Sequence, residues 1–302
     1  MNRREFSQLL SGAALAGAVV PALLTETATA TATAAAPMPT DPLFKLSVML
    51  WTVFKDLPFA QRLEKVAEAG YHAVELVNEY KDWQSADFKA ATAKLHELKM
   101  VVDCVAGVWT GIADPGARQK FLTDLDGFAP IADQLETRSI IVLSGNRVEG
   151  LTHEAHHQAC VETLKRAAEI AERRNWTLLL ENIDGEENPK YYLTSVAEGL
   201  DMIREVNHPR VKFLYDFYHE QISEGNLIEK MEKNIDQCGL FHIADVPGRH
   251  EPGTGEINYA SIFRKMAQLK YSGYVAMEFN PSSDEVGSLR TARELAIRSA
   301  QL

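Results

Sequence analysis

The chain has 302 residues, of which 46% are hydrophobic and 24% are charged, and its formal net charge is −11. An acidic chain without a long run of Lys and Arg argues against nucleic acid and anionic membranes as partners. Its three cysteines have no C-x-x-C spacing, which excludes a disulfide framework and a zinc ribbon. The length without a short leader is that of one barrel domain, and it is enough to bury a single large core.

The N-terminus is expected to be a targeting segment, residues 1–36, ahead of one folded domain, residues 37–302. Arg3 and Arg4 open a short basic region, and an Ala/Leu/Gly/Val stretch over residues 9–24 and a Thr-Ala repeat with small-x-small sites follow. The adjacent arginines resemble the twin-arginine class of signal, which a receptor reads as an address. We therefore expect export to the periplasm by the twin-arginine machinery, a route that generally carries folded proteins. An ordinary secretory signal or an anchored helix is the alternative.

From residue 46 onward, short β-type runs alternate with amphipathic helical stretches, a pattern typical of a parallel sheet. The expected strands are Leu46–Trp51, His72–Leu76, Val101–Val105, Ser139–Leu143, Thr177–Glu181, Lys212–Asp216, Leu240–Ala244 and Tyr274–Glu278. The expected helices are Phe59–Glu68, Ala86–Leu98, Ala155–Arg174, Ser195–Val206, Leu227–Asn234, Tyr259–Leu269 and Glu285–Ala300. Residues 109–135 are expected to hold one helix and a longer loop. Eight strands with eight crossovers predict a (β/α)8 TIM barrel.

Ionisable residues occupy or adjoin the ends of the last four expected strands: Glu181, Asp216, His242 and Glu278. Their gaps are 35, 26 and 36 residues (216−181, 242−216, 278−242), each close to one strand–helix unit. Because active-site groups of such barrels lie where strands end, the four side chains are expected on one face. Three carboxylates and an imidazole that meet there would repel one another unless a cation lay between them. Oxygen ligands with one histidine suit Mn²⁺, Mg²⁺ or Co²⁺, and Zn²⁺ less well.

Each of these residues alone would have an ordinary structural explanation. A single carboxylate at a strand end is more often a helix cap or a salt-bridge partner, and a single histidine in an apolar run is more often a core residue. Four of them in register on consecutive strands favour a metal site.

Two runs, DFYHEQISEG at 216–225 and HIADVPGRHEPGTGEINY at 242–259, resemble the hydroxypyruvate isomerase family within the xylose isomerase-like barrels. The similarity spans roughly residues 46–281. The resemblance implies that the four residues bind one metal ion and that Glu181 and Glu278 double as acid/base catalysts. It also implies that His219 and Arg249 hold substrate oxygens.

The residues themselves leave some of these roles open. His219 lies three positions after a strand end and can therefore face the pocket. Arg249 binds substrate or is a solvated loop charge, and Glu75, at the end of the second strand, contacts substrate or pairs with a cation. The strand-5 exit, ENIDGEE at 181–187, departs from the expected Glu-Pro, and export departs from a cytoplasmic metabolism. Both departures bear on the substrate more than on the chemistry.

The expected activity is an isomerase that moves a proton between adjacent carbons of an α-hydroxy carbonyl through an enediolate. Substrates would be hydroxypyruvate/tartronate semialdehyde or a free keto sugar, unphosphorylated because no Gly-rich phosphate cradle follows the last two strands. An epimerase, or a lyase or dehydratase acting on a keto sugar or an inositol-type ketone, would use the same site.

Two other activities are weighed against these. Phosphodiester cleavage needs more metal ligands and a basic face. An exported sugar-binding protein without turnover has no need of two catalytic glutamates. The oligomeric state, a homo-oligomer included, stays open.

Overall fold

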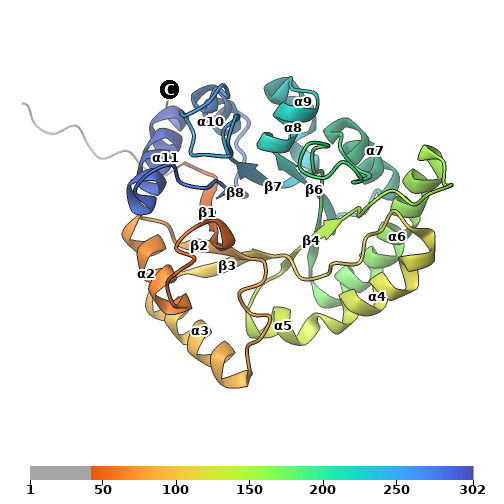
Figure 1. Ribbon diagram of the computed structural model, residues 1–302, viewed down its shortest axis with the longest axis horizontal. Helices are drawn as coiled ribbons and strands as arrows, with labels where there is room; N and C mark the ends of the chain where they lie inside the picture. Colours follow the sequence, from red (N-terminus) through yellow and green to blue (C-terminus); the bar gives the residue numbers. More distant parts are fainter. Residues whose placement is uncertain (1–41, 302) are drawn as a thin grey trace, which may run out of the picture. The chain divides into compact units, whose positions relative to one another are not determined.

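The computed structural model of the chain describes residues 42–301, and these residues form a closed barrel of eight parallel strands (Figure 1). Each strand pairs with its neighbours in chain order, and β1 closes the barrel against β8. The strands are β1 (Lys45–Met49), β2 (Ala73–Leu76), β3 (Val101–Val105), β4 (Ser139–Leu143), β5 (Thr177–Glu181), β6 (Val211–Asp216), β7 (Cys238–Ile243) and β8 (Tyr274–Met277). The predicted (β/α)8 barrel is thus confirmed, while the predicted signal segment lies outside the described residues.

Helices form the outer ring around the strands (Figure 1). They are α2 (Phe59–Glu68), α3 (Ser85–Glu97), α4 (Arg118–Gly127), α5 (Ala129–Gln134), α6 (His153–Arg174), α7 (Val196–Val206), α8 (Phe217–Ser223), α9 (Leu227–Asn234), α10 (Tyr259–Gln268) and α11 (Glu285–Ala300). Short 3₁₀ turns add η1 (Leu50–Thr52), η2 (Pro115–Ala117) and η3 (Ile235–Gln237). None of the described helices is long and apolar enough to span a bilayer.

The prediction of a single helix within residues 109–135 is wrong, because the structure has both α4 and α5 there. Gly127 ends the first helix, and Pro130 lies at the start of the second. Proline has no N–H to donate to a preceding turn, so it is tolerated at a helix start and not in a helix interior. The short helix α8 was also not anticipated.

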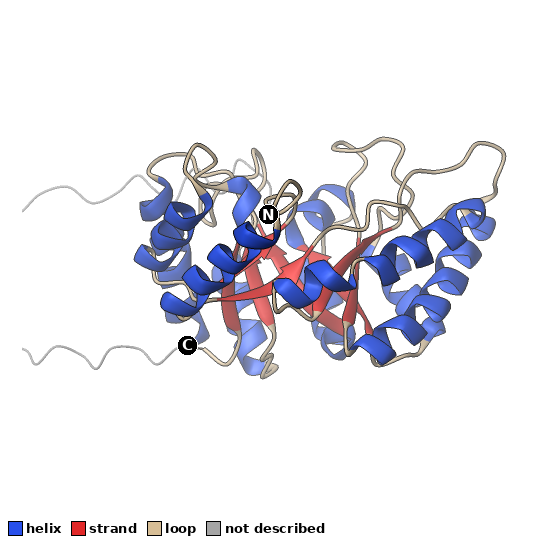
Figure 2. Ribbon diagram, turned by 90° about the horizontal axis from the view of Figure 1, so that it is seen from below, coloured by secondary structure: helices blue, strands red, loops and turns tan. Residues whose placement is uncertain are grey.

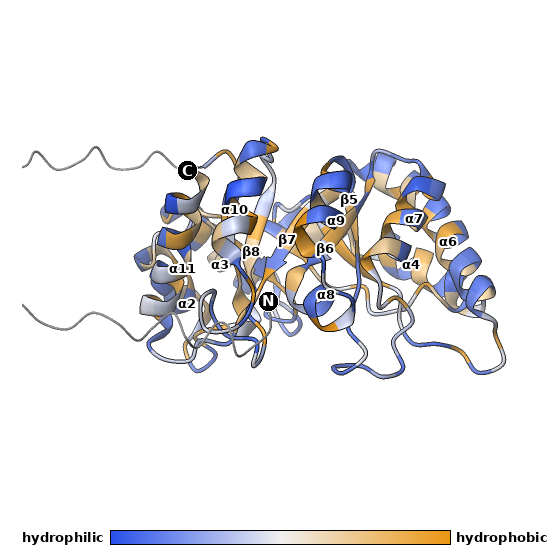
Figure 3. Cartoon of the chain, turned by 90° about the horizontal axis from the view of Figure 1, so that it is seen from above, coloured by the Kyte–Doolittle hydropathy of each residue, from blue (hydrophilic) through white to orange (hydrophobic). Residues whose placement is uncertain are grey.

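The barrel buries apolar side chains on both sides of its strands. Inside it lies a cluster of Met49, Cys104, Ala106, Ile141, Leu179, Leu214 and Leu240, and a larger cluster fills the space between strands and helices. Successive side chains of a strand point to opposite faces, so a strand buried on both faces is apolar throughout. Figure 3 accordingly shows strands coloured mainly as hydrophobic and helices of mixed colour. Each fully buried Leu, Ile or Phe contributes about 1.5–3 kcal/mol.

Long loops gather at one end of the barrel (Figure 2). Two of them, after β3 and β4, approach so closely that a Cβ on Gly111 would lie 2.7 Å from the Cα of Gly145. Only glycine fits such a contact. The helices that follow the loops after β4 and β5 begin at side-chain caps, with Thr152 capping α6 and Ser195 capping α7. Caps fix where each loop ends and therefore hold the strand exits in place.

Candidate metal centre

The four predicted ligands meet at the loop end of the barrel. Glu181 is the last residue of β5, Asp216 the last of β6, His242 lies in β7, and Glu278 directly follows β8. One ligand atom from each lies within 4.8 Å of the others, and all four side chains are buried. The structure therefore brings together four residues that lie 97 positions apart at most (278−181) on four consecutive strands.

His242 Nδ1 lies at the centre of this group. It is 2.8 Å from Glu278 Oε2, 3.2 Å from Glu181 Oε1 and 3.8 Å from Asp216 Oδ2. Although His242 Nδ1 and Glu278 Oε2 lie 2.8 Å apart, neither makes a hydrogen bond, and both atoms are buried. Leaving such an atom unpaired costs about 1–3 kcal/mol, and a divalent ion at this point would satisfy both atoms. The donor set therefore fits a metal ion.

The charges of the group also favour a cation. Burial raises the pKa of Glu181, with the carboxylates of Glu278 and Asp216 adding to the effect. Burial alone would lower the pKa of His242, but the surrounding carboxylates, Glu278 first, raise it well above its ordinary value. Negative charge thus exceeds what the one imidazole can neutralise.

Glu75, at the third position of β2, lies behind the imidazole of His242. Its Oε2 is 3.0 Å from His242 Nε2, and its side chain is fully buried. The residue was predicted to contact substrate or to pair with a cationic group, and the structure places it against the imidazole. Asp103, which sequence reasoning missed, lies close to Glu75 and adds to this buried polar group.

His219 projects from α8 toward the four residues. It is 2% exposed, with Nε2 3.5 Å from Asp216 Oδ2 and Nδ1 2.6 Å from Asp184 Oδ2. Burial opposes a charged ring, but Asp216 and then Asp184 raise the pKa of His219 to about 9. Asp184, Glu187 and His219 also lie near enough to share an ion. Both oxygens of Asp184 already have hydrogen-bond partners, because Oδ2 pairs with His219 and Oδ1 accepts the N–H groups of Glu186 and Glu187. Asp184 therefore needs no ion to satisfy its charge.

Asp184 is another residue that sequence reasoning missed. Its position before Gly185, directly after a strand exit, was the available signal for a side chain that caps its own loop.

Arg249 is 9% exposed and is not a solvated loop charge. Its guanidinium lies 2.9 Å from Glu278 Oε1 and 2.7 Å from Glu187 Oε2, and it stacks over the rings of Trp51 and Tyr218. Burial alone would raise the pKa of Glu278, but Arg249 and then His242 hold it well below its usual range. Arg249 thus keeps Glu278 ionised.

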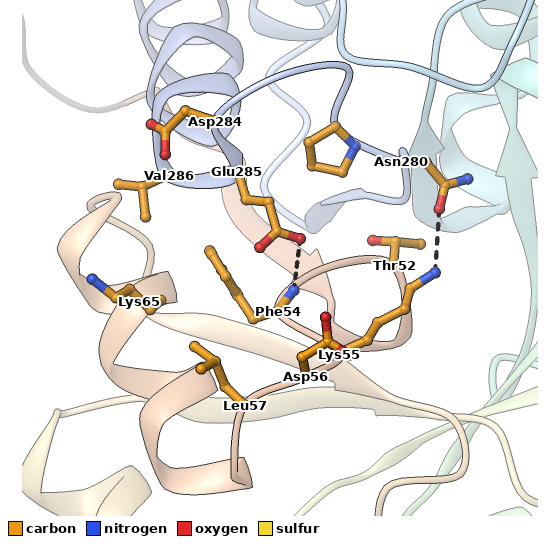
Figure 4. A pocket seen from close by; sticks show the side chains of 11 residues that line it. Thr52, Phe54, Lys55, Asp56, Leu57, Lys65, Asn280, Asp284, Glu285 and Val286 are labelled. Carbon is orange, nitrogen blue, oxygen red and sulfur yellow. Dashed lines mark hydrogen bonds between the residues drawn. The ribbon is translucent and has the colours of Figure 1, made fainter.

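Trp51 is a third residue that sequence reasoning missed. It lies in the turn η1, and its Nε1 donates a hydrogen bond of 3.2 Å to Glu278 Oε1. Beside it the loops after β1 and β8 enclose a hollow of about 580 Å³ (Figure 4). Lys55 reaches Asn280 across this hollow at 3.5 Å. None of the four grouped ligands lines this hollow, so it is not part of the centre.

The comparisons with known proteins agree with this architecture. A family model described as "Xylose isomerase-like TIM barrel" matches residues 63–300. The chain is 32% identical to hydroxypyruvate isomerase of Escherichia coli over 253 residues, 82% of this chain and 98% of that protein. It is 32% identical to 2-oxo-tetronate isomerase of Haemophilus influenzae over 251 residues, 81% of this chain and 96% of that protein.

Solved structures show the same fold. A crystal structure described as AP endonuclease, family 2 from Brucella melitensis has a TM-score of 0.73 and 29% identity, covering 82% of this chain and 96% of that chain. The structure of 3-keto-D-glucoside 4-epimerase from E. coli has a TM-score of 0.70 and 19% identity. The match covers 86% of this chain and 100% of that chain. The second likeness concerns the fold alone.

Proposed function

Because this chain belongs to the xylose isomerase-like TIM barrel family, we propose that it is a divalent-metal-dependent isomerase of small α-hydroxy carbonyl compounds. Relatives 32% identical over four-fifths of the chain are isomerases of keto acids, and the chain is an isomerase of this kind. The substrate we propose is hydroxypyruvate/tartronate semialdehyde or a free keto sugar, without phosphate. The observation that carries the proposal is the buried convergence of Glu181, Asp216, His242 and Glu278.

These four side chains would hold one ion, with Mn²⁺, Mg²⁺ or Co²⁺ preferred over Zn²⁺ for three carboxylates and one imidazole. When bound, the ion supplies a Lewis acid that stabilises negative charge on the substrate oxygens.

Glu181 and Glu278 are the proposed acid/base pair. One carboxylate removes the hydrogen of the hydroxyl-bearing carbon, that bond's electrons form the carbon–carbon double bond of an enediolate, and the carbonyl π electrons move onto oxygen. The hydroxyl proton passes to this former carbonyl oxygen, so the hydroxyl and carbonyl groups exchange places. A proton is then returned to the adjacent carbon by the other glutamate or by the same one. In the metal-free site, burial raises the pKa of Glu181, whereas Arg249 and His242 lower that of Glu278, so the two carboxylates differ in their affinity for a proton.

His219 and Arg249 are proposed to hold substrate oxygens. Both are buried, both carry N–H donors, and both lie within 4 Å of Asp216. Trp51 and Tyr218 flank the guanidinium of Arg249, which limits its motion and its hydration. Donors fixed in advance lower the barrier more than donors that must reorganise during the reaction.

The activity is tested with purified protein in heavy water, with hydroxypyruvate, 2-oxo-tetronate and free ketoses as substrates. We expect isomerisation with deuterium uptake at the carbon that gains the proton, loss of turnover with a chelator, and recovery with Mn²⁺. Inversion at one carbon without migration of the carbonyl would identify an epimerase, and loss of water a dehydratase. Full turnover in protein that holds no divalent ion would refute the metal assignment.

Export by the twin-arginine route to the periplasm is a separate part of the proposal, supported by Arg3 and Arg4 ahead of an apolar stretch. Changing both arginines to lysine should leave the precursor in the cytoplasm, as cell fractionation would detect. Periplasmic accumulation of the double variant would contradict this route.

A further inference from the structure

The two ring nitrogens of His242 face different groups. Nδ1 lies among the proposed ligands, 2.8 Å from Glu278 Oε2, whereas Nε2 lies 3.0 Å from Glu75 Oε2. His242 is 1% exposed and Glu75 is fully buried, so solvent has little access to either contact. Glu75 therefore has one evident partner on this side, and that partner is a proposed metal ligand.

We propose that Glu75 is a positioning residue that fixes His242 for divalent-ion binding, an inference that rests on the metal site of the proposed function. A neutral imidazole binds an ion through a nitrogen that carries no proton, so Nδ1 is available only when the proton is on Nε2. The Glu75 carboxylate accepts the Nε2–H and so favours that tautomer. The same hydrogen bond holds the ring plane toward the other ligands.

Glu75 is itself supported by two residues from neighbouring strands. Ser47 of β1 donates its hydroxyl to Asp103 of β3, and both side chains are buried. Glu75 Oε1 and Asp103 Oδ2 are buried without another hydrogen-bond partner. Burial, followed by the nearby Glu75 charge, raises the pKa of Asp103 well above its ordinary value. A proton retained on Asp103 can join the two carboxyl groups, which completes a chain from Ser47 to His242.

The strand register supports the same arrangement. The pairing of β2 with β3 shifts between Val74 and Glu75, so Glu75 pairs with Cys104. Irregularities of this kind redirect side chains and are frequent beside active sites. The shift places Glu75 beside the residue that follows Asp103.

The surroundings make a purely structural explanation costly. The interior cluster of the barrel is otherwise apolar, with residues such as Met49, Ile141 and Leu179. Burying carboxyl groups among such side chains costs free energy, and replacing them by apolar residues is often neutral or stabilising. A polar chain that ends on a proposed ligand is better explained by what it does to that ligand.

The test is the affinity of metal-free protein for Mn²⁺, measured by calorimetry with a competing chelator. We expect Glu75→Gln to bind Mn²⁺ about 10- to 100-fold more weakly than wild type, the usual effect of losing such a partner. Asp103→Asn, one step further away, should weaken binding less than Glu75→Gln. The rise in melting temperature on adding Mn²⁺ should shrink in Glu75→Gln, whereas a merely structural role would lower both melting temperatures equally.

Glu79→Gln is the matched control. Glu79 follows the same strand and its side chain is 5% exposed, but it pairs with Arg62 and with the N–H of Val77 rather than with a proposed ligand. Its Mn²⁺ affinity should stay within about twofold of wild type, since the change reaches no ligand.

A second measurement does not depend on a variant that folds. Nitrogen-15 spectra of the wild-type protein loaded with Mg²⁺ or Zn²⁺ should show His242 protonated at Nε2. A ring without that proton, or wild-type Mn²⁺ affinity in Glu75→Gln, overturns the inference alone. Wild-type protein that binds no divalent ion overturns the proposed function and this inference with it.

Discussion

The two halves of the barrel, β1–β4 and β5–β8, end at the same face but contribute different groups to it. Every proposed metal ligand lies in or directly after β5–β8. The first half contributes Glu75 against His242 and Trp51 against Glu278, both contacts to ligands rather than ligands. The comparison teaches that one half carries all four proposed ligands, whereas the other half contributes only contacts that hold two of them in place.

The largest effect should come from β5–β8, the half that carries the proposed ligands (the ligand-bearing half). Glu181→Gln and Glu278→Gln keep the side-chain shape but cannot accept the proton, so we expect kcat to fall about 10²- to 10⁴-fold. Steady-state assays with the best substrate would measure it. Glu256→Gln, an exposed glutamate on the loop after β7, should stay near wild type. Near-normal kcat in Glu181→Gln or Glu278→Gln would remove the assigned role.

The next effect separates ligands from catalysts within that half. Asp216→Ala and His242→Ala each delete a whole ligand, so the metal affinity should fall by at least about 100-fold, more than for a supporting residue. Elemental analysis of the purified variants should find little divalent ion. Stoichiometric metal in either variant would show that the ion, if present, lies elsewhere.

A smaller effect tests whether support also exists inside the ligand-bearing half. Asp184 holds His219 at 2.6 Å, much as Glu75 holds His242. Asp184→Asn should raise KM by about 10-fold, the value of one hydrogen bond to a charged group, with kcat less affected. Metal content should not change, because His219 is not a proposed ligand. Loss of the ion in this variant would contradict the prediction, because it would show that Asp184 supports metal binding rather than substrate binding.

The smallest effect is on the stability of the metal-free protein. The pKa of His219 is raised from 6.5 to about 9 by its carboxylate neighbours, so its contribution is complete below pH 6.5 and is lost as the pH rises through 9. Urea unfolding at a series of pH values should therefore show declining stability over this range. His219→Gln should show a smaller decline, with the remainder due to other groups whose pKa is raised, which include His242, Glu220 and His157. An unchanged decline would contradict a charged His219.

The ligand-bearing half was also the half that the sequence predicts best. Apolar runs such as Thr177–Glu181 end in a single ionisable residue, and the spacing by one strand–helix unit indicates a shared face. Strand bounds do not separate the halves in this way, because those of β5 were predicted as the structure has them, and so were those of β3 and β4. The placement of His219 near Asp216 followed from its position three residues after a strand end.

The supporting contacts could not be predicted in the same way. Trp51 and Glu278 lie 227 positions apart and meet only because β1 closes against β8. The partner of Glu75 depends on a register shift that no local pattern encodes. These contacts depend on barrel closure and strand register, which are properties of the whole barrel. The proposed ligands, in contrast, can be located from the ends of individual strands.

The three unpaired cysteines can serve as probes of local unfolding in different parts of the barrel. Cys104 lies inside the barrel, Cys160 in α6 and Cys238 at the start of β7, and all three are buried. A thiol reagent can modify such a group only after the surrounding segment opens. The labelling rate of each cysteine would therefore report separately on the barrel interior, the helical ring and the ligand-bearing strands.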